Sequence, residues 1–208
     1  MISTFTAFFD ANVFYGTYLR GLLLHLAQTK VFRARWSDAV HEEWTRNLLE
    51  KRPDLKAANL AKTRRLMDET VLDALVTGYE PLIVAMNLPD PDDRHVLAAS
   101  VVCKASCIVT FNSADFPPDR LSPYGLHAVH PDDFLLDVES IDPATFADAV
   151  RTDLDHYRAP PFDLPEYVVA LRRAGVKSMA EPNAAVARQA SSFAGVRGFA
   201  TAPSMSRP

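Results

Sequence analysis

The chain has 208 residues, 48% of them hydrophobic, and a formal net charge of −4 at neutral pH. This composition excludes a disordered protein, and the acidic balance excludes a broad basic surface that binds duplex nucleic acid by charge alone. No apolar run reaches the roughly 20 residues of a membrane span, the first residues lack the basic start of a signal peptide, and two cysteines are too few for a disulfide framework. We expect a cytoplasmic protein with free thiols and no membrane contact.

The first fifty residues predict two strands, each followed by a helix. Thr4–Phe9 is a β-branched and aromatic run, typical of a buried strand, and Tyr18–Ala27 is apolar on most sides, which favours a helix. Val31–Trp36 predicts a weaker strand. Ser37 is a typical N-cap residue, so a second helix should begin there, and Pro53 should end it.

The middle of the chain continues this alternation. Residues 54–76 are rich in helix formers and predict one or two amphipathic helices. Pro81–Met86 predicts a strand, and a further helix should have Pro91 at its first position. Cys107–Phe111 predicts a buried strand, and Leu126–Val129 a short last one. Strands separated by helices predict an α/β fold in which helices flank a mainly parallel central sheet.

The last third of the chain has a different character. Pro131–Val138 predicts a short helix that closes the domain, and residues 143–158 and 163–174 predict two more helices. From about Ser178 the chain is rich in Ala, Ser, Pro and Arg with little periodicity, so we expect disorder there. These patterns divide the chain into a domain at 1–138, a helical extension at 139–177 and a tail at 178–208.

The stretch "LPDPDDRHVL", residues 88–97, places three acids at the start of an apolar helix. In one interpretation they only stabilise that helix. Asp90 would cap it, and Asp92 and Asp93 would lie where the helix dipole favours negative charge, each contributing at most about 1 kcal/mol.

A second interpretation follows from acids elsewhere in the chain. Asp10 ends the first predicted strand, and Asp115 follows the strand "CIVTF". Ligands bind beyond the carboxyl ends of the strands in an open parallel sheet, so Asp10, Asp93 and Asp115 converge there if those two strands are neighbours. Because clustered carboxylates repel each other, this pattern predicts a divalent cation, and their oxygens suit Mg²⁺ or Mn²⁺.

A fourth acid is expected from the second predicted helix. Glu42 and Glu43 both qualify chemically. Val40, Trp44 and Leu48 form the apolar stripe of that helix. Glu43 borders the stripe, whereas Glu42 is turned further toward solvent, so we favour Glu43.

Four motifs in this order carry a family resemblance: "FFDANVF", "WSDAVHEEW", "DPDDRHVLAAS" and "IVTFNSADF". Over residues 4–138 the chain resembles PIN domains, the metal-dependent ribonuclease fold of VapC-type toxins in toxin–antitoxin modules. The helices after residue 140 resemble the extension of one subgroup. The resemblance implies a PIN-like three-layer fold that hydrolyses RNA phosphodiester bonds with Mg²⁺ or Mn²⁺. It also implies an antitoxin protein as partner and a homodimer formed through residues 18–27 and 54–76.

The resemblance further implies four acids that bind metal and carry catalysis: Asp10, Glu43, Asp93 and Asp115. The last of these falls in "TFNSADF", where Asn112 and Asp115 are both candidates, and we favour Asp115 because Asn112 adds no charge. Three residues are expected to support the site. Asn112 would orient a metal ion or a water molecule. Asp90 would act through a water molecule or only as a cap, and Thr110 would hydrogen-bond to a carboxylate or a phosphate.

Other polar residues are expected to lie outside the chemistry. None of the six histidines is well placed as a nucleophile, and His95, two residues after Asp93, should point away from the acids and pack. The basic clusters Phe32–Arg35 and Lys62–Arg65 are typical of solvated faces, with RNA phosphate contact at the acidic rim as the functional alternative.

Two other functions fit the pattern less well. A phosphohydrolase of the haloacid-dehalogenase type needs Asp-x-Asp after its first strand, and this chain has Asp10-Ala11-Asn12. A catalytically silent module of the same fold, binding RNA or a protein, is the other alternative, and the full set of acids disfavours it.

Overall fold

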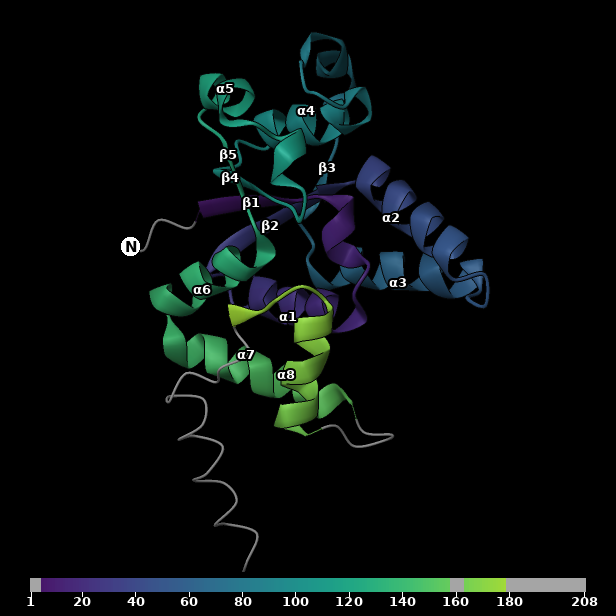
Figure 1. The fold of residues 1–208 in the computed structure, drawn as a ribbon, viewed down its shortest axis with the longest axis vertical. Coiled ribbons are helices and arrows are strands. Elements are labelled where there is room, and N and C mark those ends of the chain that lie inside the picture. Colours follow the sequence, from purple (N-terminus) through teal and green to yellow (C-terminus); the bar gives the residue numbers. More distant parts are fainter. Residues whose placement is uncertain (1–4, 158–162, 179–208) are drawn as a thin grey trace, which may run out of the picture.

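The structure, a computed structural model, describes residues 5–157 and 163–178. Within them, five strands form one sheet in the order β3-β2-β1-β4-β5, and each neighbouring pair is parallel (Figure 1). The strands are β1 Phe5–Phe9, β2 Phe32–Ser37, β3 Leu75–Val76, β4 Cys107–Val109 and β5 His127–Val129. The predicted α/β fold with a parallel central sheet is confirmed.

Helices cover both faces of the sheet and form the outer layers (Figure 1). Their bounds are α1 Thr17–Gln28, α2 Asp38–Lys51, α3 Ala57–Thr70, α4 Arg94–Val102, α5 Pro118–Leu121, α6 Pro131–Ile141, α7 Pro143–His156 and α8 Leu164–Arg173. Short 3-10 helices lie at Ala11–Phe14, Glu80–Ala85, Pro91–Asp93, Ser113–Asp115 and Ser122–Tyr124. α4 packs against β1, β2 and β4, while α1 and α6 lie on the opposite face.

An aromatic cluster fixes α6 on the sheet. The ring of Phe134 stands edge-on to Phe32 and Phe9, with ring centroids 5.0 and 5.5 Å away, and Phe5 completes the group at 6.2 Å. Edge-to-face pairs at this separation are favourable beyond the apolar area they bury. Alternate residues of β1 thus hold the sheet against α6, and the carboxyl end of β1 is rigidly placed.

Two sequence expectations for the middle of the chain are wrong. Pro81–Met86 was expected to be a strand, but Glu80–Ala85 is a 3-10 helix in which the Val84 side chain is 86% exposed. Pro81 lacks an N–H for a sheet ladder and suits the first turn of a helix, and the apolar run that follows it is not buried. The edge strand is instead Leu75–Val76, which falls at the end of the range 54–76 predicted as helical.

The helical extension packs on α1. A Cβ atom added at Gly21 would lie 2.5 Å from Oδ1 of Asp153 in α7, so glycine is what allows this close approach. Asp153 is buried, accepts a 2.6 Å hydrogen bond from the Tyr167 hydroxyl, and lies 3.1 Å from Nδ1 of His25. A buried carboxylate with two such partners fixes the extension to the domain.

This packing bears on the expected dimer surface. α1 covers residues 18–27, which were expected to meet a second copy, and it contacts α7 and α8 of its own chain; the dimer itself stays a prediction. The described cysteines, Cys103 and Cys107, are free thiols as expected. The tail expected to be disordered lies outside the described residues from 179 onward. No helix in the described residues has both the length and the apolar character needed to cross a membrane.

Candidate functional site

Asp10 is the first anchor of the site. It follows β1, is 4% exposed, and holds its carboxylate with three hydrogen bonds. Oδ1 accepts from the Ala11 N–H at 2.6 Å, and Oδ2 accepts from Nδ2 of Asn12 at 2.6 Å and from Oγ1 of Thr110 at 2.7 Å. β1 and β4 are neighbours, so the predicted contact between Thr110 and a carboxylate is present.

Burial dominates the protonation of Asp10 in spite of those bonds. Desolvation, assisted by the nearby charge of Glu43, raises the pKa of Asp10 from 3.8 to about 6, against the lowering effect of Thr110 and Ala11. A carboxylate this deep is costly to ionise unless positive charge lies beside it.

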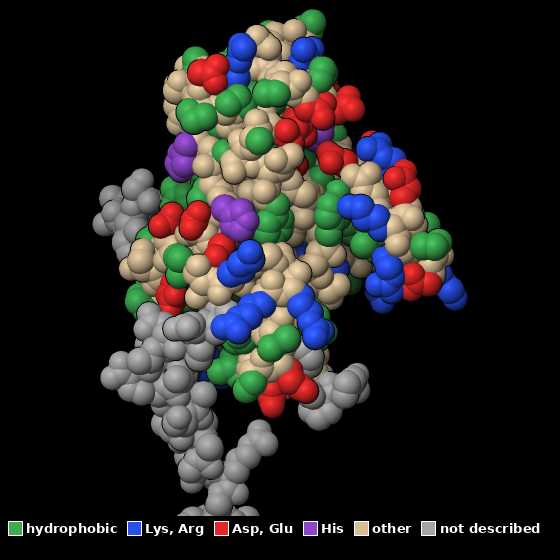
Figure 2. Space-filling model, viewed as in Figure 1, with side chains coloured by type: hydrophobic (Ala, Val, Ile, Leu, Met, Phe, Trp, Pro, Cys, Tyr) green, Lys and Arg blue, Asp and Glu red, His purple; other side chains and the backbone are tan. Residues whose placement is uncertain are grey.

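Asp93 lies where the other acids meet. It ends the 3-10 turn Pro91–Asp93 and directly precedes α4. Burial raises the pKa of Asp93 from 3.8 to about 7, and the carboxylates that add to this rise are, in decreasing order, Asp10, Asp115, Asp90 and Glu43. Four separate chain segments therefore bring negative charge to one place, and acidic side chains gather between α2 and α4 on the face shown in Figure 2.

Glu43 faces this group, whereas Glu42 is exposed. The apolar stripe of α2 therefore predicted correctly which of the two glutamates turns toward solvent. The expectation for His95 is wrong: its Nε2 lies 3.3 Å from Oε2 of Glu43, so the ring turns toward the acids. At the start of α4 the residue two positions after Asp93 turns onto the face of α2, which the spacing alone does not show. Among the described residues, Nδ1 of His95 is buried without a hydrogen-bond partner.

The remaining acids lie at the outer rim. Asp115 is half-buried and accepts a hydrogen bond from Nδ2 of exposed Asn112, so both candidates from "TFNSADF" occupy the same corner. Asp90 is exposed, and its Oδ1 accepts from the Asp92 N–H at 2.8 Å. The capping role foreseen for Asp90 is thus present, alongside its electrostatic effect on Asp93.

The carboxylates of Asp10, Glu43, Asp93 and Asp115 fit a divalent cation by their chemistry, although they do not surround a single point closely. In the described residues, no group of three or more His, Cys, Asp or Glu side chains is close enough to hold an ion as it stands. Asp10 and Asp115 accept hydrogen bonds from Thr110 and Asn112, and Glu43 lies within ion-pair distance of His95, so each of these carboxylates already has a protein partner. The mutual repulsion at Asp93 nevertheless shows that they share one region, and hard carboxylate oxygens are the ligands that Mg²⁺ and Mn²⁺ prefer.

Three residues near the site were missed by the sequence reasoning. Asn12 donates to both Asp10 and Thr110, and its Oδ1 accepts from the Phe111 N–H at 3.0 Å. Its position two residues after the strand acid was the available signal. Tyr15 accepts a 2.8 Å hydrogen bond from Nδ2 of Asn47, one helical turn beyond Glu43, and nothing in the local sequence indicates that contact.

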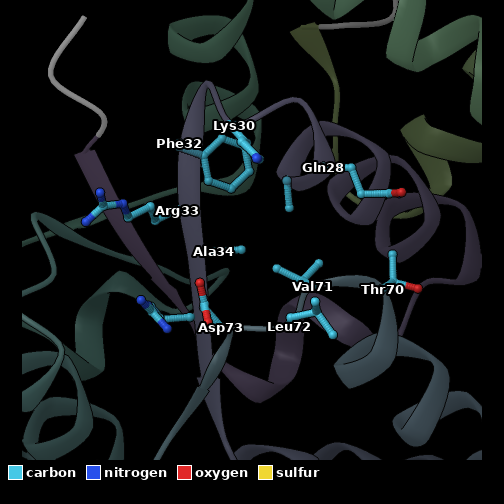
Figure 3. Close-up of a pocket in the computed structure, with 11 residues that line it drawn as sticks. Gln28, Lys30, Phe32, Arg33, Ala34, Thr70, Val71, Leu72 and Asp73 are labelled. Carbon is cyan, nitrogen blue, oxygen red and sulfur yellow. The ribbon is translucent and has the colours of Figure 1, made fainter. Parts of the chain in front are cut away.

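A hollow of about 770 Å³ lies beside the start of β2, away from the acids (Figure 3). Its walls include Phe32 and Ala34 of β2 and Val71 and Leu72 after α3. None of the acids described above lines it. Because parallel sheets bind ligands beyond the carboxyl ends of their strands, the acidic edge and not this hollow is the candidate site.

The basic clusters of the sequence are not the partners of the acids. Arg33 and Arg35, both in β2, line the same hollow. On α3, Arg64 pairs with Asp38 and Arg65 lies 3.7 Å from a carboxylate one turn along its own helix. The structure therefore gives no support to RNA contact by these clusters at the acidic rim.

Comparison with known proteins identifies two matching families. A PIN domain model matches residues 6–114, just over half of the chain, and a VapC50 C-terminal domain model matches residues 131–181. A protein of Mycobacterium tuberculosis (strain ATCC 25618 / H37Rv) named "Putative ribonuclease VapC50" is 49% identical over 90 residues, which are 43% of this chain and 52% of that protein. The chain thus spans about half the length of the curated relative that it matches. No solved structure matches the chain.

Proposed function

We propose that this chain, which belongs to the PIN-domain family, is a metal-dependent endoribonuclease that hydrolyses RNA phosphodiester bonds. The observation that carries the proposal is the crowding of carboxylates around Asp93, whose pKa of about 7 reflects burial and the charges of Asp10, Asp115, Asp90 and Glu43. Such crowding is unfavourable unless a cation binds there. The name of the matching relative, a ribonuclease, supports the same activity.

Mg²⁺ or Mn²⁺ would be held by the carboxylates of Asp10, Glu43, Asp93 and Asp115. When bound, a divalent cation lowers the pKa of water and neutralises charge on a phosphate. Three hydrogen bonds hold both carboxylate oxygens of Asp10, more than hold any of the other three acids within the described part of the chain. Buried Asp10 defines the inner end of the site, and half-buried Asp115 lies further out.

Neighbouring side chains position the acids. Asn12 and Thr110 both donate to Oδ2 of Asp10, which leaves that carboxylate a single orientation. His95 supports Oε2 of Glu43 from α4, and Asn112 donates to Asp115. A cation held by carboxylates would activate water directly, so the proposed attacking oxygen is that of water and no side-chain nucleophile is needed.

The proposal is tested with purified protein and a labelled RNA in the presence of Mg²⁺, Mn²⁺ or excess EDTA. Cleavage should require one of the two metals, and Asp10→Asn should abolish it. Glu43→Gln should remove most activity and Glu42→Gln little, because only Glu43 faces the acids. Robust cleavage in EDTA contradicts the metal requirement, and RNA binding without cleavage by the wild type supports a silent binding module instead.

A toxin role with an antitoxin partner is the most specific part of the proposal. It rests on the match of residues 131–181 to the VapC50 C-terminal domain and on the named relative. We propose a nuclease domain at 1–138 and an extension at 139–177. Co-expression with the product of a small neighbouring reading frame should give a complex that no longer cleaves RNA. An unaffected cleavage rate with every neighbouring product contradicts the toxin role.

A further inference from the structure

The chain after α8 returns to the edge where the acids lie. A Cβ atom added at Gly175 would lie 2.6 Å from Cε1 of Phe111, so this glycine lies directly on that ring. Phe111 stands between Thr110, which holds Asp10, and Asn112, which holds Asp115. The end of the extension is therefore in contact with the loop that orders two of the four acids.

A second contact lies on the other side of the same segment. A Cβ atom at Gly16 would lie 3.2 Å from Cβ of Ala174, and Gly16 directly follows Tyr15. Burial raises the pKa of Tyr15, and the charges of Glu43 and Asp10 raise it further, so Tyr15 lies close to the acids. Residues 174–175 thus touch the neighbours of the acidic group at two independent places.

The segment is held firmly in this position. Val176 is fully buried, and Gly175 has a φ of +96° that favours glycine. Both the backbone N–H and the hydroxyl of Ser178 donate to the carboxylate of Asp132 in α6, at 2.7 to 3.0 Å. Its exposed side chains are therefore presented from a fixed backbone.

The exposed cations around this segment are Arg172 and Arg173, the last two residues of α8, and Lys177 after buried Val176. We call Arg172, Arg173 and Lys177 the C-terminal cationic corner; all three are exposed. Arg173 and Lys177 form no ion pair with a carboxylate in the described part of the chain. In Figure 2, basic side chains gather at the carboxyl end of α8 and, separately, along α2.

The α2 side of the acidic group has a cation of its own. Glu43, Asn47 and Lys51 are four residues apart and share one face of α2. Nζ of Lys51 lies 4.9 Å from the centre of the Tyr15 ring, and Asn47 donates to the hydroxyl of the same tyrosine. The acidic group is therefore approached from one side by α2 with Lys51 and from another by the extension.

From this arrangement we infer that the C-terminal cationic corner binds the RNA backbone, with Arg173 and Lys177 contacting phosphates next to the scissile one. The inference rests on the proposed ribonuclease function and gives the extension its role. A chain with net charge −4 and a cluster of acids at its site repels RNA at a distance. Arg173 and Lys177 lie two residues before and after Gly175, which contacts Phe111. In the inferred arrangement they offset the repulsion and set the register of the RNA strand, because phosphate contacts position a nucleic acid without reading its sequence.

The test compares two charge-matched double variants. Arg173→Gln with Lys177→Gln removes two charges at the corner. Lys30→Gln with Lys104→Gln removes two exposed charges before β2 and β4, at the opposite edge of the sheet. The probe is a fluorescein-labelled 16-nucleotide single-stranded RNA. Its Kd is measured by anisotropy in EDTA, where cleavage is off, and KM and kcat are measured with Mn²⁺.

We expect the corner variant to raise Kd and KM about tenfold at 100 mM salt, with kcat nearly unchanged. The slope of log Kd against log salt should become shallower by about 1.4, since each single-strand phosphate contact contributes about 0.7. The control variant should match the wild type. The inference is overturned if the corner variant and the wild type have equal Kd, KM and salt slope. It is also overturned if the corner variant and the control variant lose RNA affinity equally. If the wild type binds RNA without cleaving it, the proposed function fails, and the anisotropy results still decide the role of the corner.

Discussion

Asp93→Asn should make the metal-free protein more stable while it removes cleavage. The pKa of Asp93 rises from 3.8 to about 7, so ionising this carboxyl in the folded state costs up to about 4 kcal/mol at about 1.36 kcal/mol per unit. Asp93 is partly exposed, and solvent screening reduces that cost, so we expect a gain of about 1–2 kcal/mol at pH 8. Asn keeps the shape of the side chain and relieves its repulsion with the other acids.

The pH dependence separates this effect from simple capping. The folded state binds the Asp93 proton more tightly than the unfolded state does, so the free energy of unfolding of the wild type should fall as pH rises from about 4 to about 7. Asp10, with a pKa of about 6, contributes in the same direction. At pH 4 or below, Asp93 is protonated in the folded state and the advantage of the Asn variant should vanish.

Urea unfolding in EDTA between pH 4 and 8 measures the difference, and RNA cleavage with Mn²⁺ is assayed on the same samples. Asp92→Asn is the control, because Asp92 is exposed in the same turn; it should lose a little stability and keep its activity. A fully active Asp93→Asn protein that is less stable at every pH would show that the acids only cap α4, and the reasoning about the site would be refuted.

Three further predictions follow from particular contacts. His95→Leu should raise the Mn²⁺ concentration for half-maximal cleavage about 10- to 100-fold, because Glu43 loses its polar neighbour. His95→Gln keeps a polar group at this position and should raise that concentration less. Equal Mn²⁺ concentrations for the two variants would contradict a role for the contact. Gly175→Ala should lower the free energy of unfolding by about 1–3 kcal/mol. Gly125→Ala is the control and should lower it clearly less, because Gly125 has a positive φ but no neighbour within 4 Å of an added Cβ. Equal losses of unfolding free energy in urea would mean that only backbone strain matters. His25 donates a hydrogen bond to the Asp153 carboxylate in α7, which raises the pKa of His25. The stabilisation from this pair is complete below about pH 6.5 and is lost as pH rises through the folded pKa of His25. His25→Gln should flatten that part of the profile of unfolding free energy against pH, and an unchanged profile contradicts the prediction.

The sequence was a good guide wherever one physical signal dominated. The apolar runs at β1 and β4 and the N-cap at Ser37 predicted elements close to their observed bounds, since burial and capping are local properties. The phase of α2 could be read from its apolar stripe, which turned Glu43 and not Glu42 toward the acids. The order of motifs also indicated the right family.

What the sequence did not reveal depends on packing between distant segments. His95 turns toward Glu43 because α4 lies beside α2, and no spacing within α4 expresses that neighbour. The run at Glu80–Ala85 has the composition of a strand, but the sheet edge is already occupied by Leu75–Val76, so tertiary context overrides local preference. The contact of Gly175 with Phe111 joins residues 64 positions apart and has no local signature.

The extension packs both on α1 and on the loop at the acidic edge. Gly21 allows the Asp153 carboxylate to reach the surface of α1, and Gly175 allows its own segment to contact Phe111, so a side chain at either position would force its neighbours to shift. The two contacts lie in different parts of the extension, one in α7 and the other after α8. Loosening the α7 contact should therefore also misplace the C-terminal cationic corner and raise KM for RNA, although Asp153 is no part of the site. A variant such as Asp153→Asn, which keeps the shape and weakens the ion pair with His25, should show that rise together with a lower free energy of unfolding. An unchanged KM in a clearly destabilised Asp153→Asn protein would show that Gly175 and Ser178 alone set the position of the corner.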